Sequence, residues 1–221
     1  MKEVNSYGWK AVIGSSIGYA MDGFDLLILG FMLSLISGDL GLTTGQAGSL
    51  VTWTLVGAVI GGFIFGTLSD KFGRVRVLTW TIVLFAVFTG LCAFAQGYWD
   101  LLIYRTIAGI GLGGEFGIGM ALAAEAWPAQ HRAKATSYVA IGWQLGVLAA
   151  ALLTPVLLPY IGWRGMFMVG IIPAFVAWFF RAKLHEPEIF VQSKEIKEHS
   201  HTNSFKLLVK DVRTTKTSIG V

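Results

Sequence analysis

The chain has 221 residues, of which 54% are hydrophobic and only 14% are charged, with a net charge of +4 at pH 7. Soluble domains average about 25% charged residues, so this composition, with a mean hydropathy of +0.65, excludes an ordinary water-soluble domain. The apolar residues fall in long blocks and not in the periodic stripes of a globular core, which predicts an all-α integral membrane protein.

Six of these blocks are long enough to cross a bilayer as helices, which takes about 20 mostly apolar residues. We predict spans near 11–36, 46–68, 77–95, 100–123, 136–158 and 163–180. The first block is too long for a signal-peptide core and is followed by no small-residue cleavage site, so we expect it to be retained. The single cysteine, Cys92, lies inside a block, which leaves no disulfide framework and no cysteine metal site within the chain.

The distribution of charge predicts the orientation, because Lys and Arg accumulate in short cytoplasmic loops. In the predicted topology 15 of the 17 basic residues lie on one face. The exceptions are Arg105, inside the fourth span, and Arg164, at the start of the sixth. We therefore expect a multi-pass protein of the cell membrane whose two ends, 1–10 and 181–221, are both cytoplasmic. Basic residues placed in this way indicate topology and not a nucleic-acid partner.

Three acidic residues lie deep inside the predicted spans: Asp22 and Asp25 in the first and Glu115 in the fourth. Intramembrane acids are rare and usually functional. Asp22 and Asp25 are three residues apart and so share a helix face, where two like charges in a low dielectric favour one carboxyl holding a proton near neutral pH. We predict that all three serve proton coupling. The alternative is that one aspartate merely pairs with Arg105 or caps a helix broken at Gly23.

The connector between the second and third spans combines glycines with charges. Two glycines permit a tight turn and a close helix approach, and an aspartate beside two arginines can form a charge-assisted network at the membrane surface. Positive-inside charges plus a turn would explain only the arginines. The pattern resembles the signature cytoplasmic loop of the major facilitator superfamily, in which the network latches two halves of the transporter in the outward-facing state. The residues concerned are Gly66, Asp70, Gly73, Arg74 and Arg76.

In the fourth span, an arginine precedes a run of glycines in a pattern similar to one of the same family. A buried arginine in lipid faces a partner or an aqueous cavity, so Arg105 is predicted to line the substrate or coupling cavity. The glycines are predicted to serve helix packing; they are Gly109, Gly111, Gly113 and Gly114. Weaker candidates for the cavity wall are Trp53, Thr54, Trp143 and Gln144, and either tryptophan could equally face lipid.

Further stretches look like the sialic-acid, aromatic-acid and metabolite proton-symporter branches of the family: 18–25, 41–44, 113–117, 125–128 and 162–164. The resemblance covers about residues 10–190. It implies one six-helix half of a twelve-helix fold, a small organic acid moved with protons by alternating access, and neither a cofactor nor a metal. Within such a half the family has inverted three-helix repeats, and residues 72–74 and 162–164 echo each other weakly.

From Arg181 onward the chain becomes polar. An apolar stripe there, Phe205, Leu208, Val209 and Val212, predicts an amphipathic helix on the inner leaflet, unless the tail is frayed. The chain ends where a seventh span would begin, so we expect a truncated product or fragment that needs a C-terminal half. A complete six-span protein that pairs with a second copy is the alternative.

An enzyme is not expected, because no span contains a histidine and no nucleophile motif occurs. A non-transporting membrane remnant or sensor is the competing function, and the sequence distinguishes neither the substrate nor proton from sodium coupling.

Overall fold

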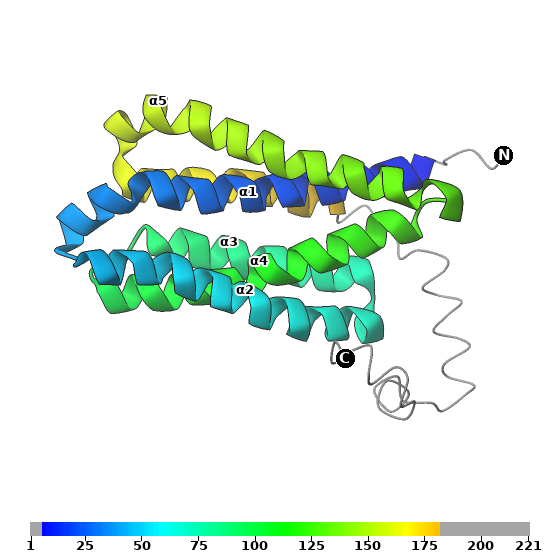
Figure 1. Cartoon of the computed structure of the whole chain (residues 1–221), viewed down its shortest axis with the longest axis horizontal. Coiled ribbons are helices and arrows are strands. Elements are labelled where there is room, and N and C mark those ends of the chain that lie inside the picture. Colours follow the sequence, from blue (N-terminus) through cyan, green and yellow to red (C-terminus); the bar gives the residue numbers. More distant parts are fainter. Residues whose placement is uncertain (1–5, 182–221) are drawn as a thin grey trace, which may run out of the picture. The chain divides into compact units, whose positions relative to one another are not determined.

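The computed structural model of the chain describes residues 6–181, which are helical almost throughout. Their elements are α1 (Ser6–Leu40), α2 (Thr44–Phe72), α3 (Arg74–Cys92), α4 (Tyr98–Glu125), a short 3₁₀ turn at Ala129–His131, and α5 (Arg132–Arg181). No strand occurs in this part of the chain (Figure 1). The amphipathic helix predicted near 205–212 lies outside the described residues.

The breaks between helices fall at residues that suit a helix end or a reversal. Thr43 caps α2 through a capping box: its hydroxyl accepts from the Gln46 N–H at 3.3 Å, and its own N–H donates to Gln46 Oε1 at 2.9 Å. Gly41, Gly73 and Gly162 have φ values of 63°, 112° and 63°, in the region that side chains with a Cβ rarely adopt. Gly162 divides α5 into two helical segments, and Figure 1 shows the chain turning back there.

Five helices are long and apolar enough to cross a membrane among the described residues. The last, α5, has 50 residues, more than one crossing needs, and its two segments correspond to the predicted fifth and sixth spans. The count of six crossings stays a prediction. The helix α3 ends at Cys92, short of the predicted span end at 95. The other helices extend past the predicted spans, since α1 runs from residue 6 to 40 where 11–36 was expected. The reason is that helical hydrogen bonding continues beyond the apolar window that marks the span.

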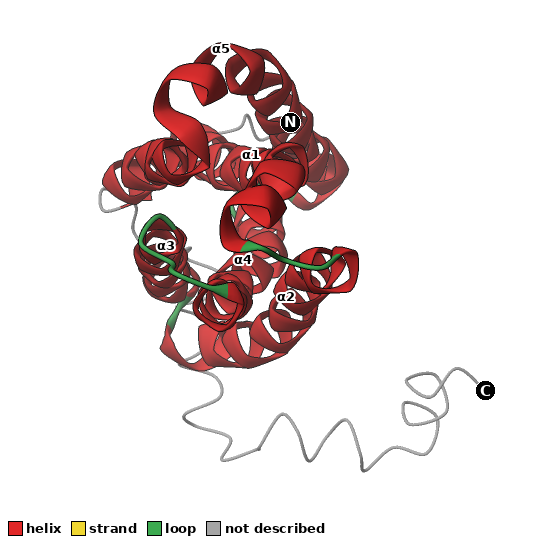
Figure 2. Cartoon of the chain, turned by 90° about the vertical axis from the view of Figure 1, so that its left-hand side faces the viewer, coloured by secondary structure: helices red, strands yellow, loops and turns green. Residues whose placement is uncertain are grey.

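The helices pack chiefly as two close pairs, α1 with α5 and α2 with α4, while α3 contacts both α4 and α5. Figure 2, which views the helices end-on, shows α4 beside both α2 and α3. At the α2–α4 crossing, glycines let the two helix backbones approach closely. A Cβ on Gly109 would meet the Thr54 carbonyl, and one on Gly113 would meet the Ala58 carbonyl. Gly142 brings α5 against the backbone of α1 in the same way. Close approach at small residues is typical of helices that associate in lipid.

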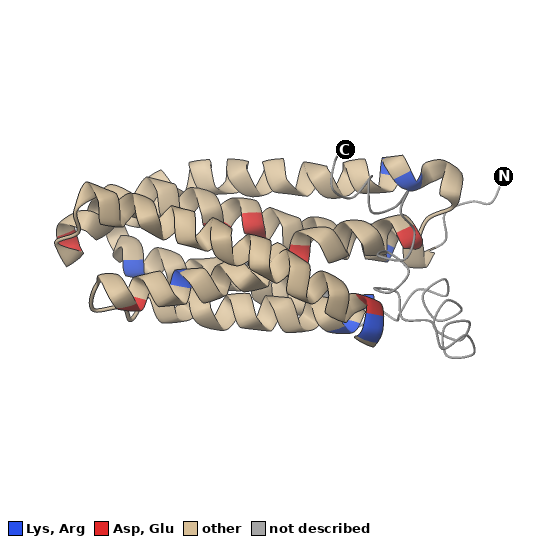
Figure 3. Cartoon of the chain, turned by 60° about the horizontal axis from the view of Figure 1, so that its bottom comes forward, with Lys and Arg blue, Asp and Glu red and all other residues tan. Residues whose placement is uncertain are grey.

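The outward-facing side chains of the bundle are largely apolar. Val59 and Phe63 of α2 are 75% and 69% exposed, and Leu152 and Phe175 of α5 are 63% and 66% exposed. Apolar patches of this extent are rare on soluble monomers. Most Lys and Arg residues of the described part lie at the end of the bundle where α1 begins (Figure 3). This distribution is that of a membrane-embedded protein.

Candidate substrate and coupling site

A buried ion pair joins α1 to α4. The Arg105 guanidinium binds the Asp25 carboxylate with both arms: Nη1 donates to Oδ1 at 3.0 Å and Nη2 donates to Oδ2 at 2.7 Å. Arg105 is 0% exposed and Asp25 is 1% exposed. Paired, bidentate charges of this kind are tolerated in a low dielectric because each neutralises the other. The pairing of Asp25 with Arg105, left open by the sequence, is therefore present in this conformation.

The other two buried acids have different surroundings. Asp22 is fully buried one turn before Asp25 on α1. Glu115 is 2% exposed, and its Oε2 accepts a hydrogen bond from Thr81 Oγ1 of α3 at 3.3 Å. Ten residues separate Glu115 from Arg105, which is roughly 15 Å along a helix. The Asp25–Arg105 pair and the Glu115 contact are therefore separate polar sites within the bundle.

The weaker candidates for the cavity wall divide into two kinds. Trp53 and Gln144 are exposed on the outside of this bundle. Thr54 is buried in the α2–α4 crossing, where its hydroxyl donates to the Leu50 carbonyl at 2.7 Å. Trp143 is half-buried and packs on α1, with its ring 5.1 Å from that of Tyr19 between centroids. Of the four, only Thr54 is thus fully enclosed by the described helices.

Phe167, in the second segment of α5, is a neighbour of the buried pair that sequence reasoning missed. It is fully buried, and the guanidinium carbon of Arg105 lies 5.7 Å from the centre of its ring. This is the geometry of a cation–π contact, which gains strength when water is excluded. The sequence offers no signal that separates it from the other phenylalanines, of which the chain has 15 in all.

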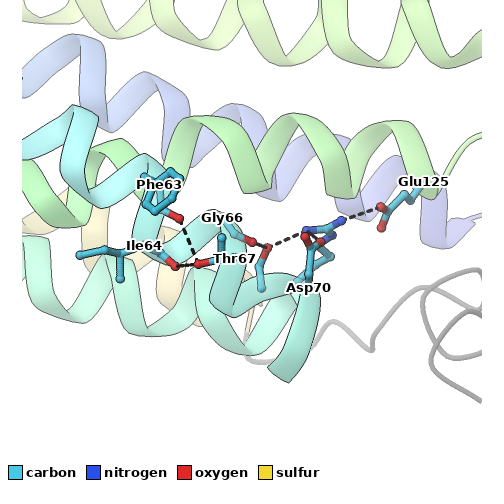
Figure 4. Close-up of polar contacts among 8 residues, drawn as sticks. Phe63, Ile64, Gly66, Thr67, Asp70 and Glu125 are labelled. Carbon is cyan, nitrogen blue, oxygen red and sulfur yellow. Dashed lines mark hydrogen bonds and ion pairs between the residues drawn. The ribbon is translucent and has the colours of Figure 1, made fainter. Parts of the chain in front are cut away.

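The network predicted for the α2–α3 loop is centred on Arg74. Its Nη1 lies 2.7 Å from Asp70 Oδ1 and donates to Ser69 Oγ at 2.6 Å, and its Nη2 lies 3.2 Å from Glu125 Oε1 at the end of α4. Figure 4 draws these contacts around Asp70 and Glu125. Glu125 was not predicted as a partner, because its sequence position is 51 residues away and only the fold brings it near.

The other residues of that loop have different surroundings. Arg76 is exposed, and a Cβ on Gly66 would meet open space. The positive φ of Gly73 makes the turn that starts α3 at Arg74. Gly66 is therefore not a point of close helix approach within this bundle.

A second charged cluster lies at the other end of the helices. Asp39, near the end of α1, accepts from Arg164 Nη1 at 2.6 Å and from Trp163 Nε1 at 3.0 Å, both on Oδ2. Arg164 Nη2 also donates to the Ala95 carbonyl beyond α3 at 3.3 Å. The bonds from Arg164 and then Trp163 hold the pKa of Asp39 below its usual value. Trp163 and Arg164 follow Gly162, as Arg74 follows Gly73, so an arginine paired with an aspartate lies just after each of these two glycines.

The chain belongs to the Major Facilitator Superfamily, whose family model matches residues 15–219. The matched region corresponds to the N-terminal half of its transporters. The family and the relatives described below are transporters and not enzymes.

Three relatives illustrate the similarity. A protein of Haemophilus influenzae, which bears the description "Putative metabolite transport protein", is 76% identical over 224 residues. The match covers 99% of this chain and 55% of that protein. The sialic acid transporter NanX of Escherichia coli is 33% identical, over 87% of this chain and 48% of its own. The cis,cis-muconate transport protein of Acinetobacter baylyi is 33% identical, over 95% and 52%. The chain thus spans about half the length of these relatives.

Solved structures share the fold. The xylose transporter XylE of Escherichia coli, in a partially occluded inward-open conformation, matches with a TM-score of 0.77 over 88% of this chain and 52% of its own, at 24% identity. At that identity the match shows the fold alone.

Proposed function

We propose that the chain forms the N-terminal, six-helix half of a proton-coupled secondary transporter that imports a small organic acid by alternating access. The observation that carries this proposal is the buried Asp25–Arg105 pair, a proton acceptor and an anion-binding group held together away from water. The relatives named for sialic acid and for cis,cis-muconate support a carboxylate as the substrate class.

Charge balance in the low dielectric explains how such a pair couples the two species. With Asp25 ionised, Arg105 is neutralised from within the chain. When a proton adds to an Asp25 carboxylate oxygen, the Arg105 guanidinium loses its counter-charge and takes the carboxylate of the substrate in exchange. Each state is neutral, so neither leaves a lone charge in the membrane interior. Protons and organic anions therefore enter and leave together.

The remaining acids have supporting roles in this proposal. Asp22 lies one turn from Asp25 on the same helix, where it passes the proton on or positions α1. Glu115, at its contact with Thr81, is a further buried proton acceptor. We assign proton coupling to the three as a group, because coupled carboxyls need not titrate singly.

The Arg74 network is the cytoplasmic latch in this proposal, and both ends of the chain are cytoplasmic. Cysteine labelling in cells tests the orientation in a background in which Cys92 is replaced by alanine. Cysteines at Gly38 and Gln96 should react with an impermeant reagent from outside, and one at Ser193 only after permeabilisation. The reverse pattern would contradict the topology.

Uptake assays test the function. They need a C-terminal half, because in this proposal that half completes the cavity. The chain should be co-expressed with the C-terminal remainder of the Haemophilus influenzae relative, reconstituted in vesicles and offered radiolabelled organic acids. Accumulation should follow an imposed pH gradient and collapse with a protonophore. The chain without its partner should show no accumulation, because alternating access needs two halves.

Robust uptake by the chain alone would indicate a transporter that pairs with a second copy. Absence of uptake for every acid with both halves inserted would favour a remnant or sensor.

A further inference from the structure

A row of aromatic rings connects the charged cluster near the end of α1 with the buried ion pair. Trp163 donates its indole N–H to Asp39 at 3.0 Å. Its ring meets that of Phe167 edge-on, with centroids 6.0 Å apart and planes at 90°. Phe167 in turn lies 5.7 Å from the guanidinium carbon of Arg105. Every step between the two ion pairs is thus a direct contact.

The two ends of this row differ in their environment. Arg105 and Asp25 are shielded from solvent, with side chains 0% and 1% exposed, whereas the side chains of Arg164 and Asp39 are 46% and 47% exposed. The rings between are buried, since Trp163 is 6% and Phe167 0% exposed. A close-packed interior transmits a displacement because its side chains have no free volume to absorb it.

The geometry of the row also fixes its orientation. Trp163 and Phe167 are four residues apart and so lie on one face of the second segment of α5. The Asp39 oxygen that accepts from Trp163 also accepts from Arg164, so the outer contact sets the angle of the indole. The indole in turn meets the Phe167 ring edge-on, which is one of the arrangements that aromatic pairs prefer.

We propose that Trp163 and Phe167 are positioning residues that join the Asp39–Arg164 contact and the Asp25–Arg105 contact into one coupled unit. Loss of the Asp39–Arg164 contact then weakens the cation–π contact between Phe167 and the Arg105 guanidinium. The inference concerns contacts within the chain and stands whether or not Asp25 carries a proton, so its failure would leave the proposed function untouched.

A double-mutant cycle on the purified chain, in lipid–detergent micelles, measures this coupling. The outer change is Arg164→Gln, the inner change is Arg105→Lys, and the readout is the equilibrium constant of unfolding. Sites that lie apart and share no partners multiply their effects to within about twofold. We expect the double variant to depart from the product of the single effects by at least threefold. If Arg105→Lys does not fold, Asp25→Asn combined with Arg105→Gln, which leaves no uncompensated charge, serves as the inner change.

The same cycle in two further backgrounds tests whether the rings carry the coupling. In Phe167→Leu, which keeps an apolar side chain but no ring, the departure should fall to within twofold. In the matched control Phe175→Leu, an exposed ring two turns further on in the same segment, it should persist. Multiplicative effects in the native background would overturn the proposal. So would a departure that survives Phe167→Leu unchanged, because the coupling would then run through other contacts.

Discussion

The substitution Asp25→Asn should strongly destabilise the folded chain. Asparagine keeps the size of the side chain but leaves the Arg105 guanidinium buried without a counter-charge. Removing one partner of a buried ion pair costs about 3–5 kcal/mol of unfolding free energy. Both arms of this pair are bonded, at 3.0 and 2.7 Å, in a site closed to water. The amide oxygen still accepts one hydrogen bond, so we expect a loss near the lower limit, about 3 kcal/mol.

The matched variants make this prediction sharp. Asp25→Asn combined with Arg105→Gln removes both charges and should recover at least half of the loss, since the cost of breaking a buried pair comes from the charge that is left uncompensated. The control Asp100→Asn, at a partly exposed site whose carboxylate accepts from Gln96 N–H at 3.2 Å, should change stability by less than about 1 kcal/mol. The assay is unfolding of the purified chain in mixed micelles, followed by tryptophan fluorescence. A cost for Asp25→Asn no greater than that of the control, or a double variant as unstable as the single one, would refute this description of the pair.

Three further outcomes are expected from the same unfolding assay. Gly113→Ala should cost about 1–3 kcal/mol because its Cβ would meet backbone, while Gly117→Ala, where a Cβ meets open space, should be neutral; equal effects would refute the tight crossing. Glu125→Gln should weaken the Arg74 contact by about 1 kcal/mol or less, because the pair is partly exposed, and a cost above about 3 kcal/mol would contradict this description. The pKa of the Asp39 carboxylate is lowered in the folded chain. The extra unfolding free energy of wild type over Asp39→Asn should therefore be fully present above the usual aspartate pKa, and should vanish as the pH falls through the pKa of the folded state. A difference that grows on acidification would contradict this.

Sequence reasoning predicted the helices well because a bilayer-sized apolar block has few alternatives. It also placed the break at the α2–α3 loop, because glycine beside charge is a local signal. It could not find Glu125 or Phe167, whose partners lie 51 and 62 residues away along the chain. Such contacts depend on how helices cross. The relation between Asp25 and Arg105 was open for the same reason, since periodicity places each on a helix but does not say which faces meet.

The role of Asp25 in coupling is tested most directly by comparing accumulation with exchange in the reconstituted two-half transporter. If Asp25 carries the proton, Asp25→Asn should abolish accumulation driven by a pH gradient, while exchange of labelled for unlabelled substrate continues. Asp22→Asn should then retain more accumulation than Asp25→Asn. The opposite order would move the proton to Asp22, and wild-type accumulation by the variant carrying both substitutions would contradict coupling through α1 and leave Glu115 as the buried acid to be tested.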